Sequence, residues 1–348
     1  MEKVFFYLLI LVPITIAAHF FHISPLFMFF LSALAIIPLA KFIGEATEVL
    51  SVYTGPALGG LLNATFGNAA ELIIGIFALR AGLIEVVKAS ITGSIIGNLL
   101  LVLGMAMLFG GTRHKKQEFN KTAAMASASM LLLAVAALII PAIFSLTAPA
   151  IDDGLVEKLS IFVAIFMLIV YLSSLWFMLF THKHLYAKEA GELEAKWSKT
   201  KSIIILLLAT IAVAWISEIL VSSIEPIVVS FGWTELFIGV IFVAIIGNAA
   251  EHTSAILMAM KNRMDLSLQI SVGSSAQIAM FVAPILVLIS LFFKEHMNLV
   301  FNTFELAAII LAVFIANLVV EDGESNWLEG VQLLTAYAIM AVAFFFHP

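Results

Sequence analysis

The five-residue motif Gly67-Asn68-Ala69-Ala70-Glu71 occurs a second time, in the other half of the chain, as Gly247-Asn248-Ala249-Ala250-Glu251. Each copy places one carboxylate inside an otherwise apolar segment. At a rise of about 1.5 Å per residue, each glutamate is expected near the middle of a hydrocarbon core about 30 Å thick. A charge at that depth is costly, so the two motifs indicate a functional site inside a membrane.

The composition agrees with a polytopic membrane protein. Of the 348 residues, 63% are hydrophobic and 11% are charged, and the mean hydropathy is +1.13. A soluble domain would carry roughly 25% charged residues. The net charge of −6 says little, because the distribution of charge among the loops matters more. The absence of cysteine excludes disulfides and thiolate metal sites.

Apolar runs bounded by charges, proline or glycine predict an all-α fold of about eleven transmembrane helices. The expected helices are 4–21, 25–43, 57–80, 86–110, 121–145, 157–181, 202–223, 235–260, 265–293, 300–319 and 326–347. The first is expected to be a retained helix and not a signal peptide, because no small-residue cleavage pattern follows it. The largest polar connector, 182–201, divides the chain near its centre.

Lysine and arginine predict the orientation. With eleven spans, 13 of the 17 basic residues fall on the N-terminal side, and the other 4 are Arg80, Lys88, Lys158 and Lys294. The N-terminus and the central connector are therefore expected in the cytoplasm, and the C-terminus outside. The basic segment 113–121 is explained as a topology signal, so no nucleic-acid partner is expected. In a prokaryotic host the expected location is the plasma membrane.

The internal repeat extends beyond the two motifs, because Gly93-Ser94 follows the first motif at the same spacing at which Gly273-Ser274 follows the second. It predicts an N-terminal helix outside the repeat, a first repeat of five helices, a cytoplasmic connector and a second repeat of five helices, over 1–22, 23–181, 182–201 and 202–348. An odd number of spans reverses the direction of the chain, so the repeats must be inverted. Inverted repeats with a midplane site at their interface are typical of secondary transporters.

Two interpretations of the motif itself stay open. In a helix, Gly67, Glu71 and Gly75 share one stripe, and small residues allow helices to pack closely. Packing, however, does not need a carboxylate. Gly-Asn beside the glutamate also favours a break in the helix, which would free carbonyl groups at the midplane where they can line a site.

The residue types favour a divalent cation such as Ca²⁺. Glu71 and Glu251 supply up to four oxygens, whereas Ca²⁺ takes roughly 6–8. Carbonyls near Gly67, Asn68, Gly247 and Asn248, water, and polar side chains could supply the remainder. The candidates along the ion path are Ser94, Asn98, Ser274, Gln277 and His252, although helix–helix hydrogen bonding would also explain the two amides.

The same pair of carboxylates suggests proton coupling. Two carboxylates buried close together resist ionising at the same time, because each charge is desolvated and repels the other. Without metal they are expected to hold protons, so metal entry must release protons and proton binding must release metal. One divalent cation or two protons would neutralise the pair.

At this point the chain resembles the calcium/proton exchangers (the CAX family) of the Ca²⁺/cation antiporter superfamily. The resemblance rests on the doubled motif, followed at a matching distance in each half by Gly93-Ser94 and by Gly273-Ser274, and it covers 25–347. It implies Glu71 and Glu251 as alternating carriers of Ca²⁺ and H⁺. His252 stands where the family often has a histidine. Glu48 and Glu218 match acidic positions on the paired long helices that the superfamily uses as a sliding gate.

The sequence therefore predicts a secondary antiporter that exchanges cytoplasmic Ca²⁺ for external H⁺ by alternating access. It is not expected to be an enzyme or to need a cofactor; its partners are Ca²⁺, H⁺ and the lipid bilayer, and a homo-oligomer is left open. A Na⁺-driven or broad-specificity exchanger on the same fold is the alternative, and a cation channel is less favoured. For Glu48 and Glu218 an antechamber role competes with an interfacial one, and for His252 a proton relay competes with a structural hydrogen bond.

Overall fold

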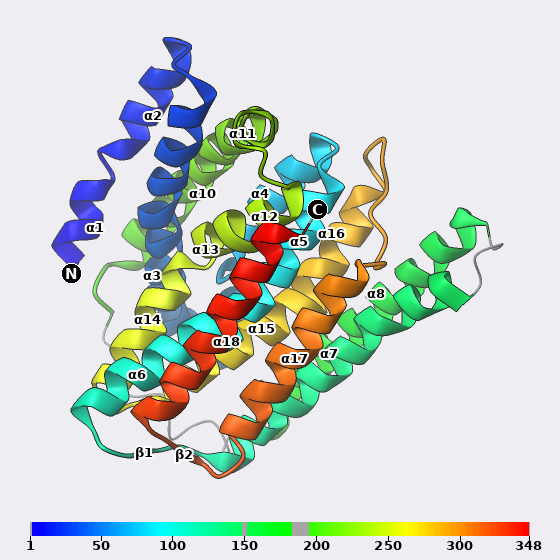
Figure 1. Ribbon diagram of the computed structural model, residues 1–348. Coiled ribbons are helices and arrows are strands. Elements are labelled where there is room, and N and C mark those ends of the chain that lie inside the picture. The colour runs from blue at the N-terminus through cyan, green and yellow to red at the C-terminus, as the bar shows by residue number, and fades with distance from the viewer. Residues whose placement is uncertain (1, 148–151, 183–194, 348) are drawn as a thin grey trace.

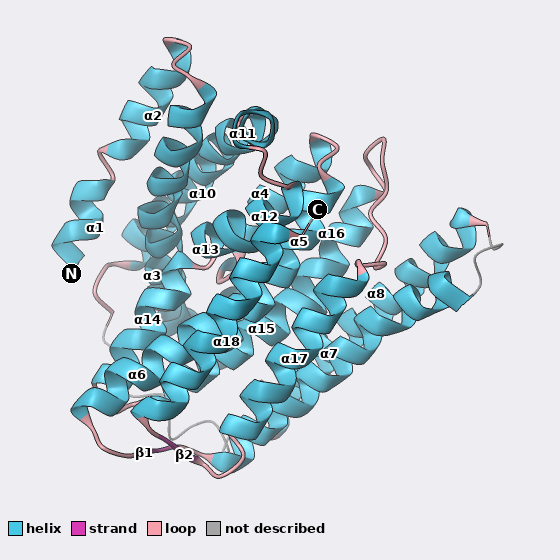
Figure 2. Ribbon diagram, viewed as in Figure 1, coloured by secondary structure: helices cyan, strands magenta, loops and turns pink. Residues whose placement is uncertain are grey.

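The computed structural model describes residues 2–147, 152–182 and 195–347, and helices dominate it (Figures 1 and 2). In chain order the elements are α1 (Glu2–Leu8), α2 (Leu11–Phe20), α3 (Pro25–Phe66), α4 (Ala69–Arg80), α5 (Ile84–Ile96), the π-helix η1 (Gly97–Val102), α6 (Leu103–Arg113), β1 (Gln117–Glu118), α7 (Lys121–Thr147), α8 (Asp153–Trp176), the π-helix η2 (Phe177–Thr181), α10 (Lys199–Ser222), α11 (Ile224–Phe231), α12 (Glu235–Phe237), the π-helix η3 (Ile238–Val243), α13 (Ala244–Gly247), α14 (Ala249–Met260), α15 (Met264–Gln277), the π-helix η4 (Ile278–Val282), α16 (Ala283–Ser290), α17 (Thr303–Val319), β2 (Glu324–Ser325) and α18 (Trp327–Phe346).

Within the described residues, seven helices are long and apolar enough to cross a membrane, and one bent pair of helices would make an eighth. The seven are Pro25–Gly55, Ile84–Arg113, Lys121–Thr147, Gly154–Thr181, Lys199–Phe231, Met264–Ser290 and Trp327–Phe346. Two shorter apolar helices, Val4–Phe20 and Thr303–Val319, accompany them. The chain is thus a largely helical, multi-pass membrane protein, while eleven spans in two inverted repeats stay a prediction.

The central spans are distinguished by their burial. The most apolar stretch of Ile84–Arg113 is 83% buried inside the protein and that of Met264–Ser290 is 67% buried, against 17% for both Gly154–Thr181 and Trp327–Phe346. In Figure 1, α2, α3 and α10 lie to one side of this centre, and α7, α8 and α17 lie to the other. The polar site described below is built mainly on the central spans.

The first long helix differs from the sequence prediction of a helix over 25–43. Helix α3 continues to Phe66 and contains one non-helical residue, Gly55, with φ 80° and ψ 170°. Glycine tolerates this positive φ, and the proline that follows it disfavours the helical conformation at Gly55. The predicted end at residue 43 was wrong because the helix continues past Lys41, which pairs with Glu45 one turn later, at 3.6 Å. Glu48 accordingly lies inside α3 and not near its end.

Both motifs interrupt their helices, which favours the second of the two interpretations, a helix break at Gly-Asn. Asn68, between α3 and α4, has φ −105° and ψ 27°. Asn248, between α13 and α14, has φ −88° and ψ 12°. The second helix bends by 61° at this point, between Glu235–Gly247 and Ala249–Met260. Each motif therefore ends one helical segment and places its glutamate in the first turn of the next.

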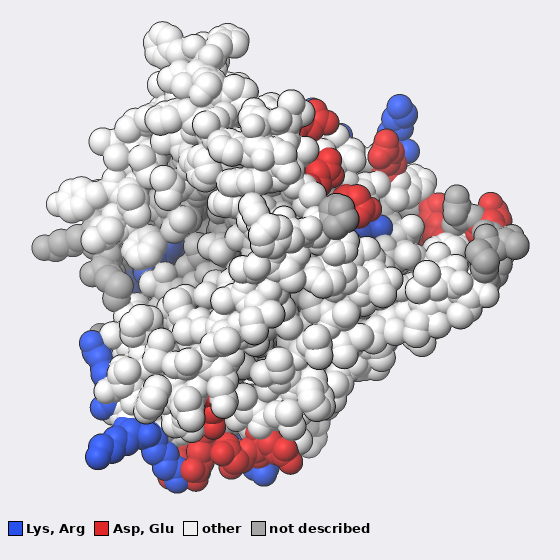
Figure 3. Space-filling view, viewed as in Figure 1, with Lys and Arg blue, Asp and Glu red and all other residues white. Residues whose placement is uncertain are grey.

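A small polar clamp lies at one end of the bundle, where β1 pairs antiparallel with β2 (Figures 1 and 2). These two-residue strands are an exception to the predicted all-α fold. Lys116 bridges the strands through ion pairs with Glu118 and Glu324. On the face shown in Figure 3, charged side chains gather at this end and at the opposite end, and a broad uncharged surface separates them.

The predicted cytoplasmic connector, 182–201, falls mostly outside the described residues. Its C-terminal end is described, and α10 begins at Lys199, slightly before the predicted start at 202. The indole ring of Trp197 stacks on Phe42 of α3, with ring centroids 6.3 Å apart. The backbone carbonyl of Trp197 accepts a hydrogen bond from Tyr53 at 2.8 Å. This end of the connector is therefore anchored to the first half of the chain.

Candidate ion-binding site

Glu71 lies directly against the second motif. A Cβ atom placed on Gly247 would come within 2.9 Å of Glu71 Cγ and 3.4 Å of its Cδ. The glutamate of the first motif thus occupies the space that a side chain at Gly247 would fill. The two motifs, which lie in opposite halves of the sequence, meet in the interior of the protein.

The two motif asparagines bond to the opposite half of the chain. Asn68 Nδ2 donates to Gln277 Oε1 at 2.6 Å, and Asn68 Oδ1 accepts from Ser274 Oγ at 3.3 Å. Both partners belong to α15. Each bond crosses from the first half of the chain to the second, so α15 is held against the break at the first motif.

The second asparagine is held in a similar way by the first half. Asn248 Nδ2 donates to Ser94 Oγ at 2.7 Å and to the Ala244 carbonyl at 2.9 Å. Asn248 Oδ1 accepts from Asn98 Nδ2 at 3.0 Å. In each half a serine and an amide side chain therefore hold the asparagine of the other half. Asn98 and Asn248 are completely buried, so these bonds satisfy groups that would be costly to leave unpaired.

The glutamate carboxylates contrast with the side chain of Asn248, whose oxygen and nitrogen both have hydrogen-bond partners. Among the described residues, Glu71 Oε1 and Oε2 and Glu251 Oε2 are buried oxygens without a hydrogen-bond partner. Each glutamate residue is half-buried when all its atoms are counted, but these three oxygen atoms are inaccessible to solvent. Buried polar atoms in folded proteins are normally paired, and an unpaired one calls for an explanation such as a bound ion. These oxygens fit a cation or proton substrate.

The position of each glutamate at the start of a helix helps to stabilise its carboxylate inside the protein. Glu71 lies in the first turn of α4, and Glu251 lies in the first turn of α14. The N-terminal end of a helix carries a partial positive charge and favours a carboxylate nearby. The broken helices thus support two acidic side chains in an interior that otherwise disfavours them.

Few other side chains in the described residues could serve as ligands for a metal ion. No group of three or more His, Asp or Glu side chains with metal-site spacing occurs within 2–147, 152–182 and 195–347. Glu71 and Glu251 could supply at most four oxygens, so a Ca²⁺ ion would need further oxygen ligands. Asn98 Oδ1 is one further buried oxygen that has no hydrogen-bond partner in the described structure.

The remaining predicted residues take different places. Gly67 lies at the end of α3, where its amide donates to the Asn63 carbonyl at 2.8 Å. His252 follows Glu251 in the first turn of α14 and is partly buried. The choice between a proton relay and a structural role for His252 stays a prediction.

The two predicted antechamber acids lie apart from the motif contacts. Glu48 is exposed on α3, near the charged residues Lys41, Glu45 and Lys196. Glu218 of α10 lies 3.9 Å from Arg80 of α4, and 58% of its side chain is exposed. An exposed ion pair of this kind adds little to stability. Their proposed role as cation collectors stays a prediction.

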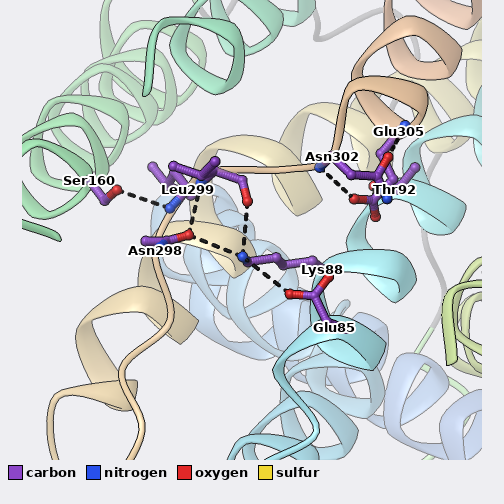
Figure 4. A network of polar contacts seen from close by, with 9 residues as sticks. Glu85, Lys88, Thr92, Ser160, Asn298, Leu299, Asn302 and Glu305 are labelled. Atoms are coloured by element: carbon purple, nitrogen blue, oxygen red, sulfur yellow. Dashed lines mark hydrogen bonds and ion pairs between the residues drawn. The ribbon is translucent and has the colours of Figure 1, made fainter. Parts of the chain in front are cut away.

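The sequence analysis missed one buried carboxylate altogether. Glu305, at the start of α17, is 1% exposed and accepts a hydrogen bond from Thr92 of α5 at 3.1 Å (Figure 4). The spacing Asn302-x-x-Glu305 was a readable signal, because it is the pattern of a helix-capping pair. Burial of the pair against α5 could not be read from that local pattern.

Broken helices and buried carboxylates inside a multi-pass helical membrane protein define a class, the membrane transport proteins. The sequence matches the family described as "Sodium/calcium exchanger protein" over residues 24–180 and 201–346. The chain therefore belongs to the sodium/calcium exchanger family.

Relatives make the likeness more specific. The chain is 48% identical to a Ca(2+)/H(+) antiporter of Aphanothece halophytica over 365 aligned positions, which cover 100% of this chain and 97% of the relative. It is 47% identical to the Ca(2+)/H(+) antiporter ChaA of Bacillus subtilis, with 99% of each chain covered. The solved structure of native YfkE has a TM-score of 0.88 and 45% identity, and the match covers 99% of this chain and 100% of that one. The resemblance to calcium/proton exchangers is thus confirmed.

Proposed function

We propose that this protein is a secondary antiporter that exchanges cytoplasmic Ca²⁺ for external H⁺. One observation carries the proposal: Glu71 packs on Gly247 of the opposite motif, and buried oxygens of Glu71 and Glu251 lack hydrogen-bond partners in the described structure. One Ca²⁺ ion or two protons would neutralise the two carboxylates equally well. The Ca(2+)/H(+) antiporters among the relatives support the same pair of substrates.

In this proposal the two substrates compete for one site. Ca²⁺ arriving from the cytoplasm displaces the protons from Glu71 and Glu251, and protons arriving from outside displace Ca²⁺. Because both carboxylates charged and empty would be costly in the protein interior, the site changes its exposure only when Ca²⁺ or protons fill it. Because an empty site cannot change its exposure, Ca²⁺ moves in one direction only when protons move in the other, and neither ion crosses the membrane alone.

The asparagine contacts suggest how the site is kept in shape. Asn68 and Asn248 each stop a helix beside a glutamate, and each is bonded to the opposite half. The half-helix ends can present carbonyl oxygens to Ca²⁺, as in transporters with interrupted helices. We further propose that the chain crosses the membrane eleven times as two inverted five-helix repeats with Ser94, Asn98, Ser274 and Gln277 along the path.

The test is proton-driven Ca²⁺ flux in everted membrane vesicles with an imposed pH gradient. Glu71→Gln and Glu251→Gln are each expected to abolish ⁴⁵Ca uptake, because an amide can neither carry the proton nor neutralise the cation. Glu321→Gln, at an exposed turn, is the matched control and is expected to transport normally. Uptake that survives in either site variant would overturn the proposed mechanism.

Two further arms of the experiment address the alternatives. A Na⁺ gradient with pH clamped on both sides should drive no uptake; if it does, the protein is a Na⁺-driven exchanger on the same fold. Ionic current that scales with voltage and carries no protons would instead favour a channel. A panel of divalent cations as competitors then measures how selective the site is for Ca²⁺.

A further inference from the structure

Glu305 is a fully buried carboxylate that the exchange mechanism described so far does not use. It belongs to a capping box at the start of α17: Glu305 Oε2 accepts from the Asn302 amide at 3.0 Å, and Asn302 Oδ1 accepts from the Glu305 amide at 2.8 Å (Figure 4). This reciprocal pair explains the residue types at 302 and 305. It does not explain why the carboxylate is buried.

Helix α18 shows that the cap alone does not require burial. Asn326 and Glu329 form the same capping box, in which Glu329 Oε2 accepts from the Asn326 amide at 3.0 Å, yet Glu329 is only partly buried. In Glu305 the second oxygen, Oε1, additionally accepts from Thr92 of α5. The feature to be explained is therefore the contact between Glu305 and α5.

A buried cation lies one helical turn before Thr92. The side chain of Lys88 is 8% exposed, and its ammonium donates to Asn298 Oδ1 at 3.0 Å and to the Val300 carbonyl at 2.9 Å (Figure 4). Glu85 lies 3.6 Å away and is 62% exposed. Lys88 and Glu305 thus lie on the same buried interface between α5 and the segment 298–305, where a charged side chain is costly unless it is hydrogen-bonded.

The resulting network fastens α5 at two levels to the segment 298–305. Lys88 is held by the loop before α17, and Thr92 is held by Glu305 in the first turn of α17. Two attachments one turn apart fix both the position of α5 along its axis and its rotation. The loop is fastened in turn to α8, because the Leu299 amide donates to Ser160 at 3.0 Å.

Helix α5, together with the π-helix η1 that continues it, carries the groups that hold the second motif. Ser94 lies two residues beyond Thr92, or about 3 Å along the helix. Ser94 and Asn98 are the side chains that bond to Asn248. A shift or rotation of α5 by a fraction of a turn would break both bonds and loosen the backbone break beside Glu251.

We propose that Glu305, together with Lys88, is a positioning residue for the ion-binding site: through Thr92 it holds α5 in the register that lets Ser94 and Asn98 bond to Asn248. Glu305 itself does not touch the transported ion. The proposal rests on the exchange function proposed above, because it assigns the network a role in Ca²⁺ affinity.

The experiment compares Glu305→Gln, Lys88→Gln and the double variant with wild type, with Glu329→Gln as the matched cap control. The readouts are the apparent KM for Ca²⁺ and the maximal rate per folded protein in the pH-driven uptake assay. Each single variant is expected to raise KM by about threefold to tenfold, the range for one or two weakened hydrogen bonds, with little change in maximal rate. The Glu329 variant should keep the wild-type KM.

The double variant separates a pair from two independent residues. If Glu305 and Lys88 act as one unit, the double variant should raise the KM for Ca²⁺ about as much as one single variant does. Two independent residues would instead give a fold increase in KM equal to the product of the two single fold increases. A KM that stays at the wild-type value in Glu305→Gln, with only thermal stability lowered, would show that the residue is a structural cap and overturn the proposal.

A milder variant keeps the test decisive if Glu305→Gln does not fold. Thr92→Val removes only the hydroxyl that reaches Glu305, and it should raise KM in the same way; an unchanged KM would again overturn the proposal.

Equilibrium ⁴⁵Ca binding to the purified protein supplies a second readout that needs no transport. Wild-type protein that binds Ca²⁺ but shows no pH-driven flux would refute the exchange function, whereas altered Ca²⁺ affinity in the variants would still support the positioning role.

Discussion

Asn68 donates a hydrogen bond to Gln277 across 209 residues of sequence, at 2.6 Å, and so joins the break of the first motif to helix α15. The corresponding contact of the second motif joins Asn248 to Ser94 and Asn98. The partners are not equivalent in sequence, because the internal repeat aligns Gln277 with Gly97 and not with Asn98. The same kind of contact is thus made with amides from different positions.

This difference predicts unequal effects of removing the two asparagines. Asn248→Ala leaves Ser94 and Asn98 without their partner in a fully buried place, whereas Asn68→Ala affects the buried Ser274 and the partly buried Gln277. A buried group left unpaired costs about 1–3 kcal/mol. Asn248→Ala is therefore expected to lower the thermal midpoint and raise the KM for Ca²⁺ more than Asn68→Ala does. Equal or reversed effects in thermal unfolding and ⁴⁵Ca uptake would contradict the structure.

The contact between Glu71 and Gly247 predicts that the site does not tolerate even one added methyl group. Gly247→Ala would place Cβ 2.9 Å from Glu71 Cγ, which must force the glutamate aside. Overpacking of this kind costs about 1–3 kcal/mol, so the KM for Ca²⁺ should rise by about tenfold. Gly97→Ala is the control, because apart from its chain neighbours and the backbone of its own helical turn no described atom lies within 4 Å of the added Cβ. A normal KM in Gly247→Ala would show that Glu71 does not need this position.

Gly93 and Gly273, which correspond in the internal repeat, should respond in opposite ways to alanine. A Cβ on Gly93 would collide with the backbone of Val240, where α5 crosses η3, whereas at Gly273 no described atom lies within 4 Å. Gly93→Ala is expected to destabilise the fold, because backbone cannot move aside as a side chain can. Gly273→Ala should be neutral or stabilising by up to about 1 kcal/mol, through helix propensity. Thermal unfolding of the two purified variants checks this contrast.

The stabilisation that the Lys116 ion pairs contribute between β1 and β2 should not change with pH over the range in which transport varies. Hydrogen bonds to Glu324, and secondarily to Glu118, raise the pKa of Lys116 above its usual value. A raised folded-state pKa means that the stabilisation is complete below the unfolded value of about 10.4 and is lost only as pH rises through the folded value.

The corresponding measurement is the thermal midpoint of Lys116→Gln relative to wild type at pH 6, 7.5 and 9. The difference should be small and equal at the three values, and it should shrink in high salt because the charges are exposed. A difference that changes strongly between pH 6 and 9 would show that another titrating group controls the clamp. Proton-driven uptake by both proteins should still vary with pH.

Local features of the sequence determined the membrane-spanning character and the places where helices break. Long apolar runs with few charges can bury their backbone in lipid only as helices, so composition alone indicated a polytopic helical protein. Gly-Asn at 67–68 and 247–248 marked the breaks, because asparagine and glycine favour caps and turns over helix interiors. The two glutamates stood out for the same local reason, a charge in an apolar segment.

The prediction from sequence failed where local signals mislead. The first long helix was predicted to end at residue 43, but Lys41 pairs with Glu45 one turn later, which makes its charge compatible with a continuing helix. Glu305 was missed, because its local sequence shows only the pattern of a helix cap. Neither outcome follows from the residues next to it in the chain, because each depends on what packs against the side chain.

Only the tertiary structure decided which groups meet. The repeat indicated that Asn68 and Asn248 correspond, but not that each bonds to a serine and an amide of the other half. It likewise did not show that Gly247 makes room for Glu71 or that Glu305 reaches Thr92. Helix periodicity determines which face a residue occupies, whereas the packing of whole helices determines what that face meets.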